Sequence, residues 1–329
     1  IAIRRGPMKT PTTGTSVFGA NAFTGNGSGT RQITTGGVTT DVVLSKILAN
    51  YGGDSPTMWT DRLRGGTSLG ISDTQGDMDS YWSLAGWYNF AVMDGYAIGG
   101  STYAYNNQAG TTQYISYGLK RAPSFLDTVC YTGSGATQTV AHNLGVAPEL
   151  MLIKCRSSFT NSWVVYCSYL TAPTTSILLL NSDIPRDTGY TTFFNSTSPS
   201  SSVITLGAGS AVNNSGTPFL AYLFATCPGV SKVGSYTGTG TTKQIDCGFA
   251  SGARFVMIKR TDSTGDWYVW DTTRGIISSN DPYFLANSPA LQVTGTDYID
   301  PYAAGFEISS TAPAAINANG GTFIFLAIA

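Results

Sequence analysis

Few residues of this sequence could carry acid–base chemistry. His142 is the only histidine among 329 residues, and it lies in Thr139-Val-Ala-His-Asn-Leu-Gly-Val-Ala-Pro148, a turn that enters a predicted strand. Neither a serine nor a cysteine nucleophile motif accompanies it, so a catalytic base here would have no group to activate. We therefore expect His142 to be a structural turn residue, with a catalytic role as the weaker alternative.

Acidic residues occur in two patterns. Asp73, Asp77 and Asp79 could offer three carboxylates to calcium, but their spacing does not match an EF-hand loop, so solvated loop residues are the preferred interpretation. Asp61–Gly65 and Asp271–Gly275 each place an arginine after an aspartate. That order indicates an ion pair that steadies a turn, whereas a glycosidase needs paired carboxylates. We predict no catalytic residue, no metal site and no cofactor.

Aromatic side chains are dense between residues 81 and 117. Exposed tryptophan and tyrosine rings can stack on sugar rings or anchor a protein contact. Trp82, Trp87 and Tyr88 are therefore candidate surface-contact residues for a glycan or a protein. The alternative is that most of these rings fill a hydrophobic core.

The charge content excludes several classes of protein. Lys and Arg number 18, Asp and Glu number 19, and charged residues make up 11% of the chain, less than half of the ~25% in an average globular protein. A net charge of −1 gives no electrostatic basis for binding nucleic acid. No stretch approaches ~18 consecutive apolar residues, so membrane insertion is not expected either. The five cysteines are irregularly spaced and are predicted to be free thiols.

The elements that must position these residues recur in the sequence. An aromatic-Thr-Gly-x-Gly phrase begins at Phe23, Tyr131 and Tyr236, which lie 108 and 105 residues apart. An apolar run that ends in lysine follows each phrase with the same spacings, at Lys46, Lys154 and Lys259. A tryptophan comes next each time, at Trp59, Trp163 and Trp267. Several landmarks in one register indicate three tandem repeats.

Each repeat has the pattern of a small β domain. In the second repeat, short runs rich in β-branched and aromatic residues predict six strands, over Cys130–Gly133, Leu150–Lys154, Trp163–Cys167, Ile177–Leu180, Val203–Leu206 and Phe219–Phe224. No segment shows sustained helical periodicity. The Gly-x-Gly of each phrase predicts a bend where side chains would clash. We expect an all-β protein of three antiparallel, jelly-roll-like β-sandwich modules.

The boundaries follow from these landmarks. We predict modules over residues 21–126, 127–230 and 231–329, joined by stiff connectors near Pro7, Pro123 and Pro228. Residues 1–20 are expected to hold the last strand of a preceding module and a linker, so that the chain would be the C-terminal part of a longer protein. The expected arrangement is a row of separate modules that reaches outward.

Several of these phrases resemble tandem-repeat virion proteins of tailed bacteriophages. The resemblance covers nearly the whole chain and is carried by Arg121–Asp127 (Arg-Ala-Pro-Ser-Phe-Leu-Asp), Cys130–Gly135, Ala141–Leu150 and Ile258–Trp267. Members of that group are commonly longer, often with a lectin-like sandwich before the repeats. The resemblance implies a tail-fibre, tail-tip or head-surface protein, and it carries over no catalytic residues.

The expected function is therefore that of a non-enzymatic virion protein, displayed on a phage particle after assembly in the host cytoplasm. As a tail fibre or receptor-binding protein it would form a homotrimer, contact other virion proteins and bind a host-surface glycan or receptor. A capsid decoration protein that binds neighbouring capsomers is the alternative. A glycan-degrading tailspike is the least favoured, because it needs acidic pairs in a chain that is poor in Asp and Glu.

Overall fold

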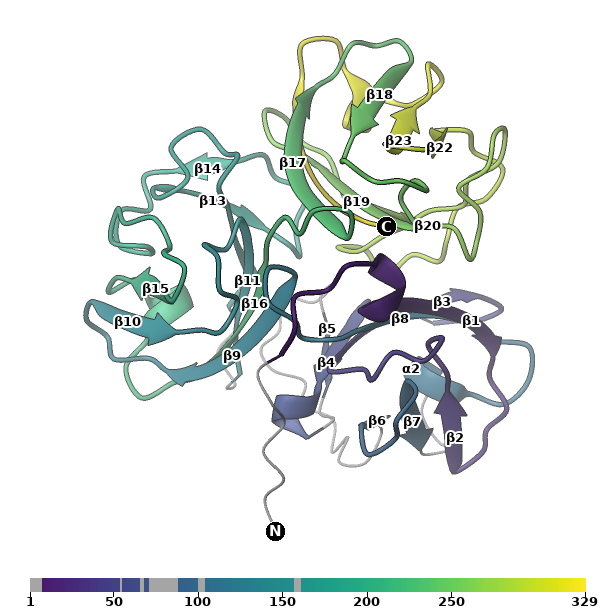
Figure 1. The fold of residues 1–329 in the computed structure, drawn as a ribbon, viewed down its shortest axis with the longest axis horizontal. Coiled ribbons are helices and arrows are strands. Elements are labelled where there is room, and N and C mark those ends of the chain that lie inside the picture. The colour runs from purple at the N-terminus through teal and green to yellow at the C-terminus, as the bar shows by residue number, and fades with distance from the viewer. Residues whose placement is uncertain (1–7, 54, 66–67, 71–87, 100–103, 157–160) are drawn as a thin grey trace.

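Strands make up nearly all of the regular structure. The computed structural model describes residues 8–329 apart from residues 54, 66–67, 71–87, 100–103 and 157–160. Of the chain, 41% is strand and 6% is helix, and every sheet is antiparallel, which confirms the prediction of an all-β protein. The three repeats form three lobes around a common centre (Figure 1).

The second repeat shows how one lobe is built. A six-stranded sheet has the order β14-β13-β12-β11-β16-β9, and a two-stranded sheet pairs β10 with β15. The strands are β9 (Leu126–Thr132), β10 (Gln138–Ala141), β11 (Leu150–Cys155), β12 (Val164–Cys167), β13 (Ser176–Leu179), β14 (Asp187–Thr188), β15 (Val203–Leu206) and β16 (Pro218–Phe224). All six predicted strands are present, and β10 and β14 are additional.

The first and third repeats follow the same plan, with large sheets ordered β1-β8-β3-β4-β5 and β17-β24-β19-β20-β21 and small sheets β2-β7-β6 and β18-β23-β22. The first repeat contains β1 (Phe18–Thr24), β2 (Thr30–Ile33), β3 (Val42–Ala49), β4 (Met58–Asp61), β5 (Ser68–Gly70), β6 (Tyr88–Asn89), β7 (Tyr96–Gly99) and β8 (Gln113–Leu119). The third contains β17 (Ser231–Thr237), β18 (Lys243–Asp246), β19 (Phe255–Arg260), β20 (Trp267–Asp271), β21 (Phe284–Leu285), β22 (Ile299–Tyr302), β23 (Gly305–Ile308) and β24 (Thr322–Ile328).

Helical segments are one turn long. In each repeat a four-residue helix precedes the last strand of the large sheet: α2 (Ala104–Asn107), α3 (Ser210–Asn213) and α4 (Ala314–Asn317). There are also two 3₁₀ turns in the described residues. The turn η1 (Gly14–Ser16) lies before β1, and η2 (Arg62–Arg64) lies between β4 and β5 of the first repeat. No helix in the described ranges could cross a membrane.

The large sheets are buried on both faces. Along β11, Leu150 and Leu152 belong to one hydrophobic cluster, whereas Met151 and Ile153 belong to another beneath the small sheet of the same repeat. Successive side chains of a strand point to opposite faces, so continuous apolar runs such as Leu150–Ile153 mark strands that are covered on both sides. One face therefore builds a core within the lobe, and the other face turns to the centre of the molecule.

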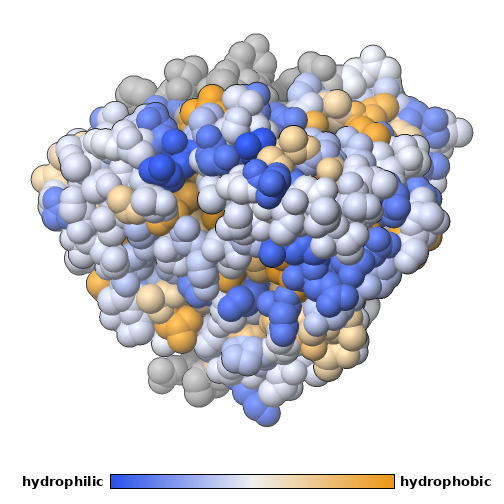
Figure 2. Space-filling model, turned by 90° about the horizontal axis from the view of Figure 1, so that it is seen from above, coloured by the Kyte–Doolittle hydropathy of each residue, from blue (hydrophilic) through white to orange (hydrophobic). Residues whose placement is uncertain are grey.

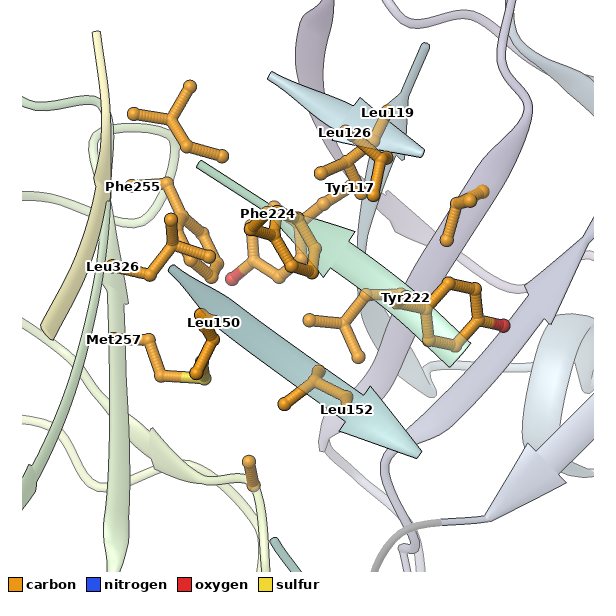
Figure 3. Packing of buried hydrophobic residues seen from close by; sticks show 14 of the residues in the cluster. Tyr117, Leu119, Leu126, Leu150, Leu152, Tyr222, Phe224, Phe255, Met257 and Leu326 are labelled. Carbon is orange, nitrogen blue, oxygen red and sulfur yellow. The ribbon is translucent and has the colours of Figure 1, made fainter. Parts of the chain in front are cut away.

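The central faces of the three large sheets share one core. Figure 3 shows it at close range, with Tyr117 and Leu119 from the first repeat, Leu150, Tyr222 and Phe224 from the second, and Phe255, Met257 and Leu326 from the third. The prediction of separate modules in a row is therefore wrong. Each large sheet has an apolar second face, and folding removes all three of these faces from water by bringing them together.

The proline-containing connectors lie in this central core and do not separate the lobes. Ala122 and Phe125 in one connector, and Cys227 and Val230 in the next, are buried in the same cluster as the sheets. Each connector is a tight turn, with Phe125 N donating to Ala122 O at 3.1 Å and Val230 N to Cys227 O at 2.9 Å. The stiff spacers expected near Pro123 and Pro228 are thus turns that lead the chain from one lobe to the next around the centre. Pro7 lies outside the described residues.

The Gly-x-Gly bends occur as predicted. A Cβ added to Gly133 would lie 2.1 Å from Asn214 O, so no side chain fits there, and Gly135 has φ +71°, a left-handed conformation that glycine adopts at little cost. Between them, the Ser134 backbone N–H donates to the Asn213 side chain at 2.8 Å. The other two repeats have an asparagine in the same place, at Asn107 and Asn317.

One of the predicted landmarks is out of register. Trp267 is paired with Lys259. Val165 is paired with Leu152, so Trp163, two residues before Val165, lies at the level of Lys154, the equivalent lysine of the second repeat. Trp59 is instead paired with Leu44, two positions further along its strand than the other two tryptophans. Trp59 fills the central core from a different position, which agrees with its longer spacing from the preceding lysine, 13 residues against 9 and 8 in the other two repeats.

The start of the chain packs against its end. Residues 8–17, which we expected to include a preceding module's strand or linker, contain only the turn η1, and β1 runs across the predicted boundary at residue 20. Cys227 Sγ donates to Pro11 O at 3.7 Å, and a Cβ on Gly14 would lie 1.7 Å from Ala329 O. This segment is therefore seated on the central core beside the last strand.

Candidate functional site

The predicted aromatic contact residues do not form a site on the described surface. Tyr88 is 3% exposed, its hydroxyl shares a 3.0 Å hydrogen bond with Ser45 Oγ, and burial raises its pKa to about 12. The interpretation of Tyr88 as a surface-contact residue is therefore wrong, because its ring fills the core of the first lobe. Trp82 and Trp87 lie outside the described residues, as do Asp73, Asp77 and Asp79.

His142 is held by the backbone. Its Nε2 lies 3.2 Å from Ser200 O, its Nδ1 accepts from Leu144 N at 3.3 Å, and burial lowers its pKa. These contacts connect the loop after β10 to the residues before β15. The ring therefore stabilises a turn, as the sequence predicts.

The described part of the chain contains neither a group of metal ligands nor a reactive cysteine site. There, no group of three or more His, Cys, Asp and Glu side chains is placed to hold a metal ion. All five cysteines are free thiols, and burial raises the pKa of Cys167 and of Cys247 to about 12. The thiols of Cys167 and Cys247 therefore stay protonated and poorly reactive near neutral pH.

The two Asp–Arg motifs form buried ion pairs between lobes. Asp61 accepts hydrogen bonds from the backbone N–H and from Nε of Arg64. The Tyr222 hydroxyl, which comes from the second repeat, donates to Asp61 at 3.0 Å and accepts from Arg64 at 3.1 Å. The prediction of a turn-steadying ion pair is confirmed, and the pair also anchors a neighbouring lobe.

The third repeat repeats this arrangement with the first. Asp271 accepts from the backbone and from Nε of Arg274, and Tyr117 of the first repeat donates to Asp271 at 2.8 Å. Burial raises the pKa of both Tyr117 and Tyr222 well above the ordinary value. Each hydroxyl therefore remains a proton donor to its carboxylate over the physiological range of pH.

The junction between the second and third repeats has no such network. The strand pairing places Cys167 at the position of Asp61 and Asp271, and Leu326 at the position of Tyr117 and Tyr222. Leu170 takes the place of the arginine, three residues after Cys167. All three polar members are thus replaced together by apolar or weakly polar side chains, which are buried in the central core.

The recurrent lysines also connect lobes. Lys46 of the first repeat donates to Ser55 O and, at 2.6 Å, to Ser288 O of the third. Lys259 of the third repeat donates to Gly265 O and, at 2.9 Å, to Asp183 O of the second. Burial lowers the pKa of Lys46 to about 7 and that of Lys259 to about 8. Lys154 is likewise buried, and its amine donates to Asn161 O.

A surface cleft lies where the second and third repeats meet. Two neighbouring hollows of about 400 Å³ and 490 Å³ share Tyr169, Ser235, Tyr236 and Thr237 in their walls, and we name the pair the 2–3 cleft. Its third-repeat wall is β17, the edge strand of its sheet. The face of the molecule seen in Figure 2 is mostly of intermediate to hydrophilic character, and its hydrophobic residues show as separate spots.

Tyr169 forms the second-repeat wall of the 2–3 cleft. It is 39% exposed and lies in the turn between Cys167 and Leu170. Its hydroxyl donates to Glu149 at 3.4 Å, and the other Glu149 oxygen accepts from Thr226 N. The ring is thus held in place while a part of it stays open to solvent.

Charged groups of both signs line the 2–3 cleft and are positioned by the fold. The Arg186 backbone N–H donates to Thr261 O at 2.9 Å, which ties the loop before β14 to the third repeat. Asp262 accepts from Arg260 at 3.0 Å and from Thr322 N at 3.0 Å. The cleft wall is therefore fixed by contacts that do not use the exposed hydroxyls of Ser235 and Thr237.

Another hollow, of about 570 Å³, lies elsewhere, beside residues 8–17 and Lys120–Ala122. The carboxylate among its described lining residues is engaged, since Asp41 accepts from Arg62 at 2.8 Å and from Arg121 N at 2.9 Å. The 2–3 cleft is the better defined candidate site.

Sequence analysis did not single out the residues of the 2–3 cleft. Tyr169 and Arg186 lie in loops of the second repeat, whereas Ser235 and Thr237 belong to a strand of the third. No spacing links these segments, because their proximity depends on the packing of the lobes around the centre. The sequence offers one signal for this site. Tyr169 is an aromatic residue at the position that Leu63 has in the Asp61–Arg64 turn and Thr273 has in the Asp271–Arg274 turn.

Comparison with known proteins gives a family without an assigned role. A family model described as a domain of unknown function (DUF7483) matches residues 13–329, which include all three repeats. No curated protein matches the chain.

Proposed function

We propose that this chain, which belongs to the DUF7483 family, is a non-enzymatic structural protein of a phage particle that acts as an adhesion or receptor-binding protein. The observation that carries the proposal is that the buried charged side chains make structural contacts between lobes. Asp61 with Arg64, Asp271 with Arg274, and Lys46 and Lys259 all make contacts between lobes. These groups hold a scaffold together, and the polar cleft lies at the surface.

The phage resemblance of the sequence supports the location, and the packing refines the expected shape. We interpret each lobe as one sandwich-like module, with its large sheet over its small sheet. Because the three modules share a core, the chain presents loops and clefts at its surface and does not extend as a rod. In this proposal the reach of a fibre is supplied by other virion proteins.

A capsid decoration protein is the second candidate. The observation that favours it is the arrangement of three similar lobes around one centre (Figure 1). Such a unit matches a threefold site of a capsid lattice, where three equivalent neighbours would each meet one lobe.

Imaging of the phage that encodes this chain tests the location. Cryo-electron microscopy of the virion, with gold-labelled antibody against the chain, is expected to place it at the tail. Density at lattice positions of the capsid would establish the second candidate, and absence from purified particles would refute both. Incubation with host polysaccharide is expected to release no reducing ends, and their release would refute the non-enzymatic assignment.

The homotrimer is tested separately. We propose that three chains associate through the outer surfaces of their lobes, because the central core is already filled within one chain. Analytical ultracentrifugation is expected to show three times the 34.6 kDa of one chain. A species of 34.6 kDa at micromolar concentration would refute the trimer and leave the location untouched.

A further inference from the structure

We infer that the 2–3 cleft is a saccharide-binding site, with Tyr169 as the ring on which a sugar stacks. This inference rests on the proposed function in that it names the class of ligand through which adhesion would occur. It does not depend on where the protein lies in a particle, because a purified chain would bind the same ligand.

The size of the 2–3 cleft fits a short oligosaccharide. Its two hollows measure about 400 Å³ and 490 Å³, and each alone is within the range of about 300–1,000 Å³ that is common for small-molecule sites. They lie on either side of Ser235–Thr237 and share that segment. A chain of linked rings could therefore occupy both hollows, whereas a single small ion would fill neither.

The chemistry of the walls fits a ligand that is rich in hydroxyl groups. Ser235 and Thr237 point exposed hydroxyls along the edge strand, and Gln244 on β18 adds an exposed amide. Arg186 and Asp246 carry planar groups that can engage neighbouring hydroxyls, whereas both carboxylate oxygens of Asp262 already accept from Arg260. Because charges of both signs occur along the cleft, it has no strong preference for a highly charged polymer.

Tyr169 supplies the apolar surface that sugars need. A tyrosine ring is amphipathic and loses little conformational entropy on binding, so it suits contacts in which one face is apolar and the surroundings are polar. Glu149 holds the hydroxyl of Tyr169 at 3.4 Å, and the residue is 39% exposed and lines both hollows. The ring is therefore placed before any ligand arrives, which reduces the cost of binding.

The position of the 2–3 cleft distinguishes it from the equivalent places in the molecule. Leu63 occupies the position of Tyr169 in the first repeat and is 49% exposed, and Thr273 occupies it in the third. Neither has an aromatic ring, so the stacking surface belongs to this junction alone among the three turns. Leu63 is therefore a matched control for Tyr169.

The test uses the purified full chain and an array of immobilised saccharides. The probes are neutral oligosaccharides, oligosaccharides of N-acetylhexosamine, uronic-acid oligosaccharides and bacterial surface polysaccharides. Wild-type protein is expected to bind at least one class, Tyr169→Ala to weaken that binding at least tenfold, and Tyr169→Phe to keep it within about threefold. Leu63→Ala is expected to bind as the wild type does.

A second variant blocks the cleft without removing a contact of the scaffold. Ser235→Trp places a large side chain on the exposed face of the edge strand and is expected to abolish binding, with thermal unfolding confirming that the variant is folded. The proposal is overturned if wild-type protein binds no saccharide of the array, if Tyr169→Ala and Ser235→Trp bind as well as wild type, or if the cleft instead takes extended peptides. Binding by a chain that is absent from virions would uphold this site and refute only the proposed location.

Discussion

The junctions between lobes solve one packing problem in two ways. Where the first repeat meets the second and the third, an aspartate, an arginine and a tyrosine form a buried polar network. Where the second meets the third, Cys167, Leu170 and Leu326 take the same three places. The strands that carry these positions are paired in the same register in all three repeats, so the three places are equivalent whichever set of side chains fills them. The comparison teaches that these three positions act as a set, because no junction mixes members of the two solutions.

The largest effect is expected from breaking a polar network. Asp61→Ala leaves the buried Arg64 guanidinium, whose side chain is fully buried, without its carboxylate. Removing one partner of a buried ion pair typically costs about 3–5 kcal/mol. Urea unfolding should show this loss, while Cys167→Ala at the equivalent position should cost about 1 kcal/mol. Equal losses would show that the two solutions do not differ in kind.

The lysines, which all three repeats share, predict a dependence on pH. Burial lowers the pKa of Lys46 to about 7, so above pH 7 the folded chain has released a proton that the unfolded chain keeps to about pH 10.4. The unfolded state then binds more protons, and the free energy of unfolding rises with pH, by at most about 1.4 kcal/mol per pH unit for one group. Lys259, with a pKa of about 8, adds to the rise at the upper end of this range.

Urea unfolding at pH 7 and pH 8.5 measures that dependence. Wild-type protein is expected to gain about 1–2 kcal/mol between these values, and Lys46→Met to gain clearly less. Asp281, whose pKa burial raises to about 7, acts in the opposite direction and mainly below this range, because its folded form keeps a proton that the unfolded form loses from about pH 4. A flat profile in wild-type protein would contradict the assignment of Lys46.

A smaller effect is expected from the tyrosine of a polar network. Tyr117→Phe removes the hydroxyl that donates to Asp271 and keeps the ring that packs against Phe255. Loss of one hydrogen bond to a buried charge should lower the midpoint of thermal unfolding by an amount that corresponds to about 1–2 kcal/mol. Tyr190→Phe, which removes an exposed hydroxyl bonded to Asp187, is the matched control and should cost less than about 0.5 kcal/mol.

The smallest effect is expected from exchanging one solution for the other. Asp61→Cys, Arg64→Leu and Tyr222→Leu together give the junction between the first and second repeats the same three side chains as the junction between the second and third. Replacing a buried polar set by apolar groups of suitable shape is often close to neutral, so the triple variant should unfold within about 1 kcal/mol of wild type. A loss larger than that of Asp61→Ala alone would show that the polar network itself specifies the junction.

Local features were predictable from the sequence, and the arrangement of the lobes was not. Repeat spacing and β-rich runs located the strands of the second repeat, and Gly133 and Gly135 marked a bend because close approach and positive φ both demand glycine. The continuous apolar run Leu150–Ile153 also held the signal for a sheet covered on both faces, which a row of separate modules leaves unexplained.

The candidate site was beyond the reach of sequence reasoning for a physical reason. Aromatic composition drew attention to Tyr88, but a tyrosine ring fills a core as readily as it lines a surface. Tyr169 became a candidate only when the cleft beside Ser235 and Thr237 was known, since the residues meet across two repeats. The Asp–Arg ion pairs were predictable because each forms between residues three apart in one turn, whereas the contact of His142 with Ser200 and those of the two tyrosines depend on the fold.

The contact of Gly14 with Ala329 makes the three repeats a closed circuit. Because the segment before β1 is seated against the end of β24, the beginning of the first repeat and the end of the third lie together. Circularly permuted chains, joined across this contact and reopened at the turn near Pro123 or Pro228, should therefore fold to the same molecule.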